Sequence, residues 1–182
     1  VALKMLPFGA VLDPRKIAAV AQVAHRHSLK LVAHAHGARS IREAILAGAD
    51  TIEHASLIDA ETIELARQHQ VALSMDVYNG DYTDTEGRRQ GYPEEFLRKN
   101  TETTEAQRQG FTAALEAGVP IVYGTDACIY PHGLNARQFP IMVERARLGA
   151  GESYERLRDN RQAIELYRMI VDNPVDPAMK KD

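Results

Sequence analysis

Three short apolar runs of the sequence end in side chains that can bind a metal ion. His34 and His36 lie in the run LVAHAHG, His54 lies in TIEHAS, and Asp126 lies in IVYGTDA. Each run precedes a helical pattern, and the carboxyl ends of parallel strands gather on one face of an α/β protein. Two imidazoles and a carboxylate on that face would suit a divalent metal that activates water.

Asp126 has two predicted roles in such a site. Its carboxylate can bind the metal, and it can take the proton from the attacking water. Capping of a turn or helix is the structural alternative for this residue. His34 and His36 are two residues apart, so on a continuing strand they face the same side and could share one metal in a mononuclear hydrolase. If the strand ends at His34, His36 belongs to the following loop.

Residues near these runs are candidates for contact with substrate. His132 follows Asp126 in a turn that could overhang the site, and Arg137 and Tyr78 are candidates of the same kind. A small acidic or peptide substrate would be held by a cation near the metal. Lys4 lies within an apolar strand, where it would be a surface lysine if taken alone. It could be a metal ligand only if its charge were removed or inverted.

Strand-like and helical runs alternate along the chain, which predicts an α/β protein with a parallel sheet covered by helices. Strands are expected near the start and over residues 29–33, 51–54, 71–75 and 119–123. These units fit a (β/α)8 TIM-type barrel, but they supply about five strands where a closed barrel needs eight. A half-barrel leaves two unpaired edges, so we expect a partial barrel that belongs to a longer protein or pairs with a second copy.

Two regions depart from this rhythm. Residues 76–100 are rich in Gly and Tyr and are expected to form a long functional loop. Residues 152–171 predict one charged amphipathic helix. The expected domain division is therefore a barrel part over residues 1–148 and a helical tail over residues 149–182.

Composition narrows the classes of partner. The net charge is −3 and basic residues are scattered, so nucleic acid is not expected as a partner. No apolar stretch approaches the roughly 18 residues of a membrane span. The single cysteine cannot form an internal disulfide and leaves the redox compartment open, so we expect either the cytoplasm or, if the full protein carries a leader, the periplasm.

The ordered motifs resemble the amidohydrolase superfamily, in particular its imidazolonepropionase-like and Xaa-Pro dipeptidase-like members. The resemblance covers residues 1 to about 148 and is carried by ALKMLPFGAVLDP, KLVAHAHGARSIREAILAGADTIEHASLID and IVYGTDACIYPHGLNARQFPIMV. It implies a distorted (β/α)8 barrel with a small β-sandwich, of which residues 171–181 faintly resemble one segment. It also implies a pair of zinc ions and hydrolysis of amide or other C–N bonds in a small amide or dipeptide substrate.

The resemblance also implies roles for single residues. Lys4 resembles the strand-four lysine that bridges two metals once carboxylated. His34 and His54 resemble the strand-five and strand-six metal ligands. Asp126 resembles the strand-eight aspartate that binds metal and shuttles the proton.

His36 follows the ligand in the HAHG motif, a neighbourhood that contacts substrate in the family, and His132 matches a PHG element after strand eight. The strand-one H-x-H pair of the family is absent, so one of the two metals loses two ligands. We therefore expect one or two Zn²⁺, or another divalent metal. The alternative is a non-catalytic half-barrel or metal-binding fragment.

Overall fold

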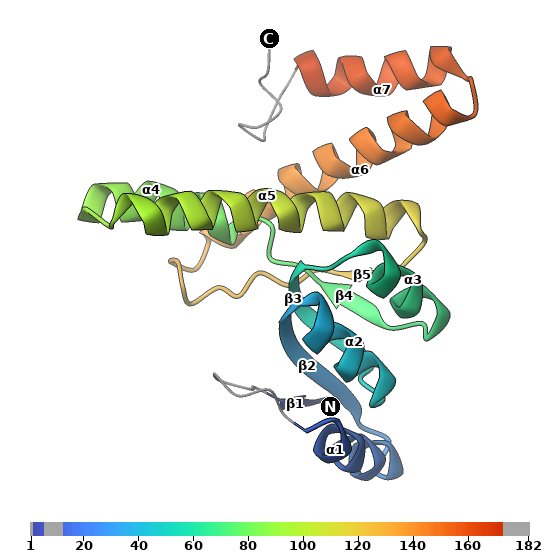
Figure 1. Ribbon diagram of the computed structural model, residues 1–182. Coiled ribbons are helices and arrows are strands. Elements are labelled where there is room, and N and C mark those ends of the chain that lie inside the picture. The colour runs from blue at the N-terminus through green and yellow to red at the C-terminus, as the bar shows by residue number, and fades with distance from the viewer. Residues whose placement is uncertain (1, 6–12, 173–182) are drawn as a thin grey trace.

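Five parallel strands follow one another across one sheet in chain order, from β1 to β5 (Figure 1). The computed structural model describes the backbone of residues 2–5 and all of residues 13–172. The strands are β1 (Ala2–Met5), β2 (Lys30–Gly37), β3 (Thr51–Leu57), β4 (Ala72–Ser74) and β5 (Ile121–Val122). The helices are α1 (Pro14–Arg26), α2 (Ala38–Leu46), α3 (Ala60–Gln68), α4 (Asn79–Gln90), α5 (Glu94–Glu116), the 3-10 helix η1 (Leu134–Arg137), α6 (Gln138–Arg156) and α7 (Asn160–Asp172). The expected α/β class with a parallel sheet is confirmed.

Side chains of β2 alternate between two environments. Leu31, Ala33 and Ala35 are at most 6% exposed, on the side of the strand that packs against α1 and α2. The strand continues to Gly37, so His34 and His36 share the opposite side, as expected for a strand that does not stop at His34. A fully buried leucine stabilises by roughly 1.5–3 kcal/mol. The apolar row therefore holds the register that also presents the two histidines.

Helix α5 crosses the sheet near the carboxyl end of β3, with α6 and α7 on its far side (Figure 1). Phe111 and Ala114 of α5 are buried in the main apolar core. Gln107 is buried one turn earlier on the same helix. This helix therefore brings a polar side chain to the end of the sheet where the candidate ligands lie.

The segment expected to be a long loop, residues 76–100, is mostly helical. Gly91 ends α4 in a left-handed conformation, with φ of 74°, and Pro93 is the N-cap of α5. Within α4, a Cβ added to Gly87 would lie 2.8 Å from the ring of Tyr92. The loop expectation was wrong because these glycines and the proline mark helix ends and a close contact between helices.

The C-terminal part forms two helices rather than the one expected over residues 152–171. Between α6 and α7 the chain turns at Arg158, which has φ of 61°. The two helices pack closely, because a Cβ on Gly151 would lie 2.5 Å from the ring of Tyr167. The expected division after residue 148 falls inside α6.

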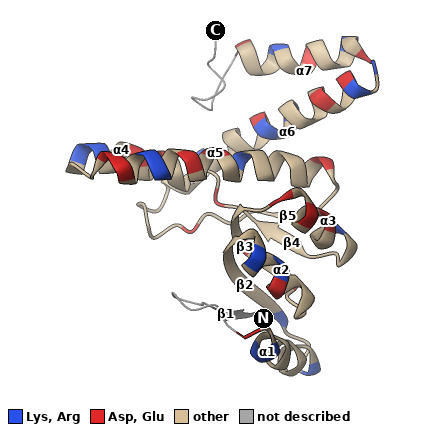
Figure 2. Cartoon of the chain, viewed as in Figure 1, with Lys and Arg blue, Asp and Glu red and all other residues tan. Residues whose placement is uncertain are grey.

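Charges of both signs are interspersed along the helices, most densely on α4 and α5 (Figure 2). Many of them pair within one helix, such as Arg88 with Asp84 at 3.0 Å. Within residues 2–5 and 13–172, no helix is both long enough and apolar enough to cross a bilayer.

Candidate metal centre

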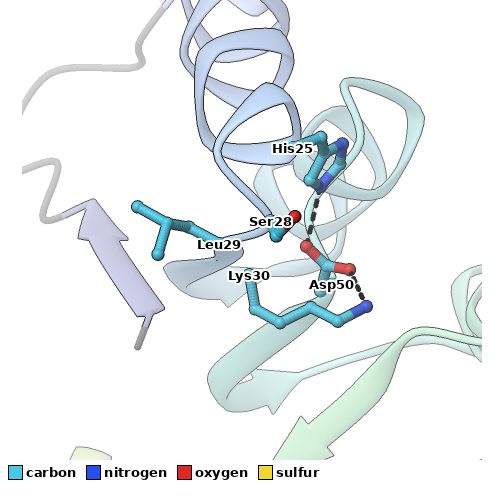
Figure 3. A pocket seen from close by; sticks show the side chains of 5 residues that line it. All are labelled: His25, Ser28, Leu29, Lys30 and Asp50. Carbon is cyan, nitrogen blue, oxygen red and sulfur yellow. Dashed lines mark hydrogen bonds and ion pairs between the residues drawn. The ribbon is translucent and has the colours of Figure 1, made fainter.

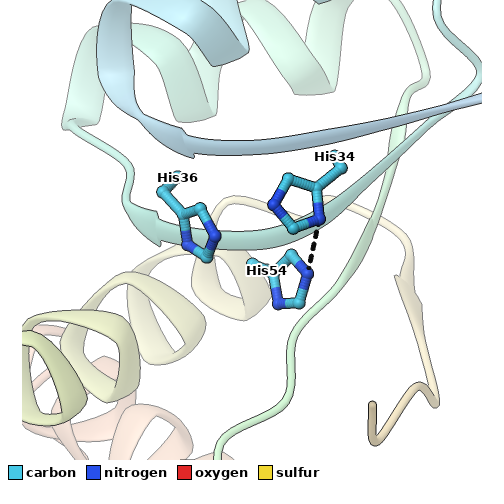
Figure 4. A group of neighbouring side chains, drawn as sticks. All are labelled: His34, His36 and His54. Atoms are coloured by element: carbon cyan, nitrogen blue, oxygen red, sulfur yellow. Dashed lines mark hydrogen bonds between the residues drawn. The ribbon is translucent and has the colours of Figure 1, made fainter. Parts of the chain in front are cut away.

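Two histidines from neighbouring strands meet at the carboxyl side of the sheet. His34 Nδ1 lies 2.9 Å from His54 Nε2, and the two ring centroids are 4.3 Å apart (Figure 4). His34 comes from β2 and His54 from β3, which pair in parallel. The expected convergence of these two imidazoles is thus present in the structure.

The backbone of β3 is irregular where it carries His54. Ala35 pairs with His54 and His34 pairs with Glu53, so regular alternation would put Glu53, rather than His54, on the side of His34. His54 and Ala55 instead have φ of 69° and 48°, and both Glu53 and His54 line the same pocket. Left-handed backbone costs a non-glycine residue about 1–3 kcal/mol. This bend turns the His54 side chain towards His34.

Two carboxylates complete the surroundings of His54. Asp76 follows β4, and its Oδ1 lies 3.1 Å from His54 Nδ1. Asp126 lies in the turn after β5 with φ of 49°. His54, Asp76 and Asp126 each offer a ligand atom, and these three atoms lie within 4.8 Å of one another. The same three residues line a small pocket of about 100 Å³ with Glu53, Ser74, Gly124 and Thr125.

Burial and charge shift the pKa values of this group in different directions. Burial alone would raise the pKa of Asp76, but hydrogen bonds from His54, Asn79 and Gln107 hold that pKa well below its usual range. Burial would lower the pKa of His54, yet the carboxylates of Asp76 and Asp126 raise it overall. Strong shifts of this kind concentrate at functional sites.

The pKa of His36 shifts the opposite way. Burial lowers it, and the neighbouring rings of His54 and His34 lower it further. His36 Nδ1 also lies 2.9 Å from Ser56 Oγ. A neutral imidazole is the form that binds a metal, so this environment favours a ligand-competent ring.

The donor atoms fit a divalent metal in two overlapping groups. One group is His34, His36 and His54, and the other is His54, Asp76 and Asp126. Imidazole nitrogen and carboxylate oxygen are the donors that Zn²⁺ takes in catalytic sites. His54 belongs to both groups and is therefore the centre of the candidate site.

The structure does not bring all the predicted substrate contacts to this pocket. His36 stacks on His54 with ring centroids 4.6 Å apart. Arg137 Nη1 lies 3.3 Å from Tyr78 Oη, so these two candidates lie together, although neither residue lines the pocket of about 100 Å³ beside Asp126. His132 is exposed in the turn after Pro131. Its predicted role in substrate contact stays a prediction.

Lys4 lies in β1 and pairs with Val32 of β2, two residues before His34. Its side chain is outside the described part of the structure, so its predicted role as a carboxylated ligand stays a prediction. The segment 171–181, expected to resemble part of a sandwich, is described only up to residue 172.

Sequence reasoning missed two residues of the site. Asp76 directly follows the apolar run over residues 71–75, so the rule that selected His34 and Asp126 could have found it. Gln107 lies in the middle of α5, and its Nε2 lies 2.8 Å from Asp76 Oδ1. No local pattern marks a glutamine of this kind, because its role depends on where the helix crosses the sheet.

A comparison of the whole sequence with models of known protein families identifies the family of this chain. The sequence model of the amidohydrolase family matches residues 7–176. The chain belongs to the amidohydrolase family. The expected resemblance is thereby confirmed, and the family match extends through α6 and α7, beyond the residues on which the resemblance was based.

Individual amidohydrolase relatives are similar over most of this chain. Ochratoxinase of Aspergillus niger is 28% identical over 139 residues, which are 76% of this chain and 28% of that protein. The crystal structure of a Xaa-Pro dipeptidase with bound methionine in the active site has a TM-score of 0.67 at 27% identity, over 82% of this chain and 39% of that one. The crystal structure of A. niger ochratoxinase has a TM-score of 0.66 at 24% identity, over 77% of this chain and 34% of that one, which shows a shared fold. The chain thus spans well under half the length of these relatives.

Proposed function

We propose that this chain carries part of the active site of a metal-dependent hydrolase that cleaves an amide or other C–N bond in a small substrate. The observation that carries the proposal is the meeting of His34 and His54 at 2.9 Å, with a ligand atom of Asp126 within 4.8 Å of His54. The amidohydrolase family and the similarity to a dipeptidase support the same reaction class.

His34 and His54 would hold the metal, with Asp126 beside them and carboxylated Lys4 as a further predicted ligand. Zn²⁺ is the proposed ion because it accepts both nitrogen and oxygen donors. When bound, the metal would supply a Lewis acid that lowers the pKa of a water molecule and polarises the carbonyl group of the substrate.

Asp126 performs the proton transfer in this proposal. Its carboxylate takes the proton from the attacking water and passes it to the nitrogen of the leaving group. The left-handed backbone at Asp126 sets its carboxylate at the pocket that His54 also lines. This position supports the proposed role of Asp126 at both ends of the reaction.

The substrate carboxylate of a dipeptide would need a cation or hydrogen-bond donors near the site. His36 is at the exposed edge of the histidine group, and Arg137 and Tyr78 form a polar pair after β4 and β5. We propose His36, His132, Arg137 and Tyr78 as substrate contacts. A guanidinium group suits a carboxylate because it can donate two parallel hydrogen bonds.

Metal stoichiometry combined with a substrate panel tests the proposal. Purified 182-residue chain is stripped with chelator, titrated with Zn²⁺, and assayed against dipeptides, N-acyl amino acids and cyclic imides. We expect bound zinc and zinc-dependent hydrolysis of at least one class. Zinc binding without hydrolysis would support the non-catalytic metal-binding alternative, and absence of zinc binding would contradict a metal-dependent enzyme in this chain.

A further inference from the structure

Gln107 reaches from α5 into the carboxyl end of the sheet and contacts two parts of the site at once. Its Nε2 lies 2.9 Å from the carbonyl oxygen of His54 and 2.8 Å from Asp76 Oδ1. The side chain is buried, with 6% of the residue exposed. An amide nitrogen has two protons, so it can donate one to each of these oxygens.

The carbonyl oxygen that Gln107 binds belongs to the strained part of β3. His54 and the following Ala55 are both left-handed. Such a conformation persists only where neighbouring groups hold it in place. The donor from Gln107 fixes the peptide group of His54 from a different element, so α5 helps to maintain the bend that aims His54 at His34.

Asp76 acts on the ring of the same histidine. Its Oδ1 accepts from Gln107 and lies 3.1 Å from His54 Nδ1, while its Oδ2 accepts from Asn79 Nδ2 at 2.9 Å. An ionised carboxylate can only accept hydrogen bonds, so His54 must carry a proton on Nδ1. The neutral ring then presents the lone pair of Nε2 to His34, which lies 2.9 Å away.

We infer that Asp76 and Gln107 are positioning residues for His54. Gln107 holds the carbonyl of His54 and the carboxylate of Asp76, and Asp76 holds the proton on Nδ1, so that Nε2 keeps its lone pair on the side of His34, where a metal ion would bind. Carboxylate partners of this kind orient histidine ligands and raise their basicity. The ligand role of His54 rests on the proposed function, whereas the position of its proton does not.

Asn79 makes a conservative test of Asp76 possible. The Oδ1 atom of Asn79 is buried and has no hydrogen-bond partner among the residues that the structure describes. In Asp76→Asn, the new amide oxygen can still accept from His54, and its nitrogen can donate to Asn79 once that amide has turned. Asp76→Asn therefore preserves the positioning contact but makes a poor metal ligand, whereas Asp76→Ala removes both.

The test compares five proteins: the wild-type chain, Asp76→Asn, Asp76→Ala, Gln107→Met and the control Gln109→Met. Gln109 is an exposed glutamine on the same helix. Long-range ¹H–¹⁵N NMR on the metal-free proteins, at a pH where the ring is neutral, locates the proton of His54. We expect it on Nδ1 in the wild type, Asp76→Asn and Gln109→Met, and on Nε2 in Asp76→Ala. In Gln107→Met, the Nδ1 proton should exchange faster with water.

Zinc affinity, measured by competition with a chromophoric chelator, gives the second readout. Asp76→Ala and Gln107→Met should bind roughly 10–100-fold more weakly, while Asp76→Asn and Gln109→Met stay within about threefold of the wild type. Urea unfolding checks that each variant is folded. Gln107→Glu, which keeps the shape but repels Asp76, replaces Gln107→Met if the latter does not fold.

A wild-type ring protonated on Nε2 would overturn the inference, as would unchanged zinc affinity in both Asp76→Ala and Gln107→Met. Equal losses in Asp76→Asn and Asp76→Ala would make Asp76 a direct ligand and overturn the positioning role. If the wild type binds no zinc, the proposed function fails. The NMR measurement alone then decides whether Asp76 and Gln107 position the ring of His54.

Discussion

The sheet carries a histidine–aspartate pair at each end, and the two pairs differ in almost every physical respect. At the amino end, His25 Nε2 lies 2.8 Å from Asp50 Oδ2, and the two side chains are 46% and 19% exposed (Figure 3). At the carboxyl end, His54 Nδ1 lies 3.1 Å from Asp76 Oδ1, and both side chains are 8% exposed. The same two residue types are thus partly exposed to solvent at one end and almost completely buried at the other.

The surrounding charges explain what each pair can do. Asp50 also accepts from Lys30 Nζ at 2.7 Å and from the backbone N–H of Leu31 at 2.8 Å, so its charge is matched by donors and shared with water. At the carboxyl end, Asp126 adds a second carboxylate near His54. An excess of carboxylates and imidazoles around the buried His54–Asp76 pair attracts a cation, whereas the amino-end pair stabilises the turn between α2 and β3.

The largest expected difference between the two ends is in hydrolysis. Asp126→Asn should lower turnover by roughly 10²–10⁴-fold, because the amide cannot take a proton from water. Asp50→Asn, at the other end of the sheet, should leave turnover within about twofold of the wild type. Steady-state assays with the substrate class that responds to zinc measure both. Full turnover in Asp126→Asn would remove the proton-transfer role.

The next largest difference is expected in zinc affinity, which should fall when His54 is replaced and stay unchanged when His25 is replaced. His54→Ala removes a donor that both candidate ligand groups share, so binding should weaken by more than about 100-fold. His25→Ala removes no candidate ligand, and its affinity should equal that of the wild type. Chelator competition measures both, and equal affinities for the two variants would contradict the assignment of the metal centre to the carboxyl end.

The pH dependence of the free energy of unfolding should reveal the contribution of Asp50 at the amino end of the sheet. Burial raises the pKa of Asp50, but donors from Lys30, Leu31 and His25 outweigh it and hold that pKa below its usual value of 3.8. A lowered pKa in the folded state stabilises the fold above the unfolded-state pKa, and this contribution is lost as the pH falls through the folded-state pKa.

Asp50→Asn should therefore lower the free energy of unfolding by about 1 kcal/mol at pH 7. The difference from the wild type should be constant above about pH 5 and should shrink below about pH 3.8. Urea unfolding across this range measures it. A difference that grows as the pH falls would have the wrong sign for this explanation.

The smallest effect is expected for His25→Gln. The ring is half-exposed and its ion pair is screened by water, so the free energy of unfolding should change by less than about 0.5 kcal/mol. Chemical denaturation at pH 7 measures the change. A loss several times larger would show that the amino-end pair is more than a surface contact.

Local patterns in the chain were enough to predict much of the architecture. Asp13 and Pro14 predict the start of α1, and Asp13 indeed accepts from the backbone N–H of Arg15 at 2.9 Å. Apolar runs ending in His34 and Asp126 predict strands whose carboxyl ends meet. These signals are local, because helix caps and strand periodicity depend on residues within one turn or one strand.

The sequence by itself determined the parallel α/β class and the family, since both depend on periodicity and on motifs that can be read along the chain. The sequence also predicted that His34 and His54 converge, but only the tertiary structure showed that a left-handed bend turns His54 towards His34, because regular alternation would have turned it away. The tertiary structure also decided that Asp76 and Gln107 meet at His54. The physical reason is that a left-handed bend and a crossing helix are held by contacts between residues more than 20 positions apart, which no local pattern records.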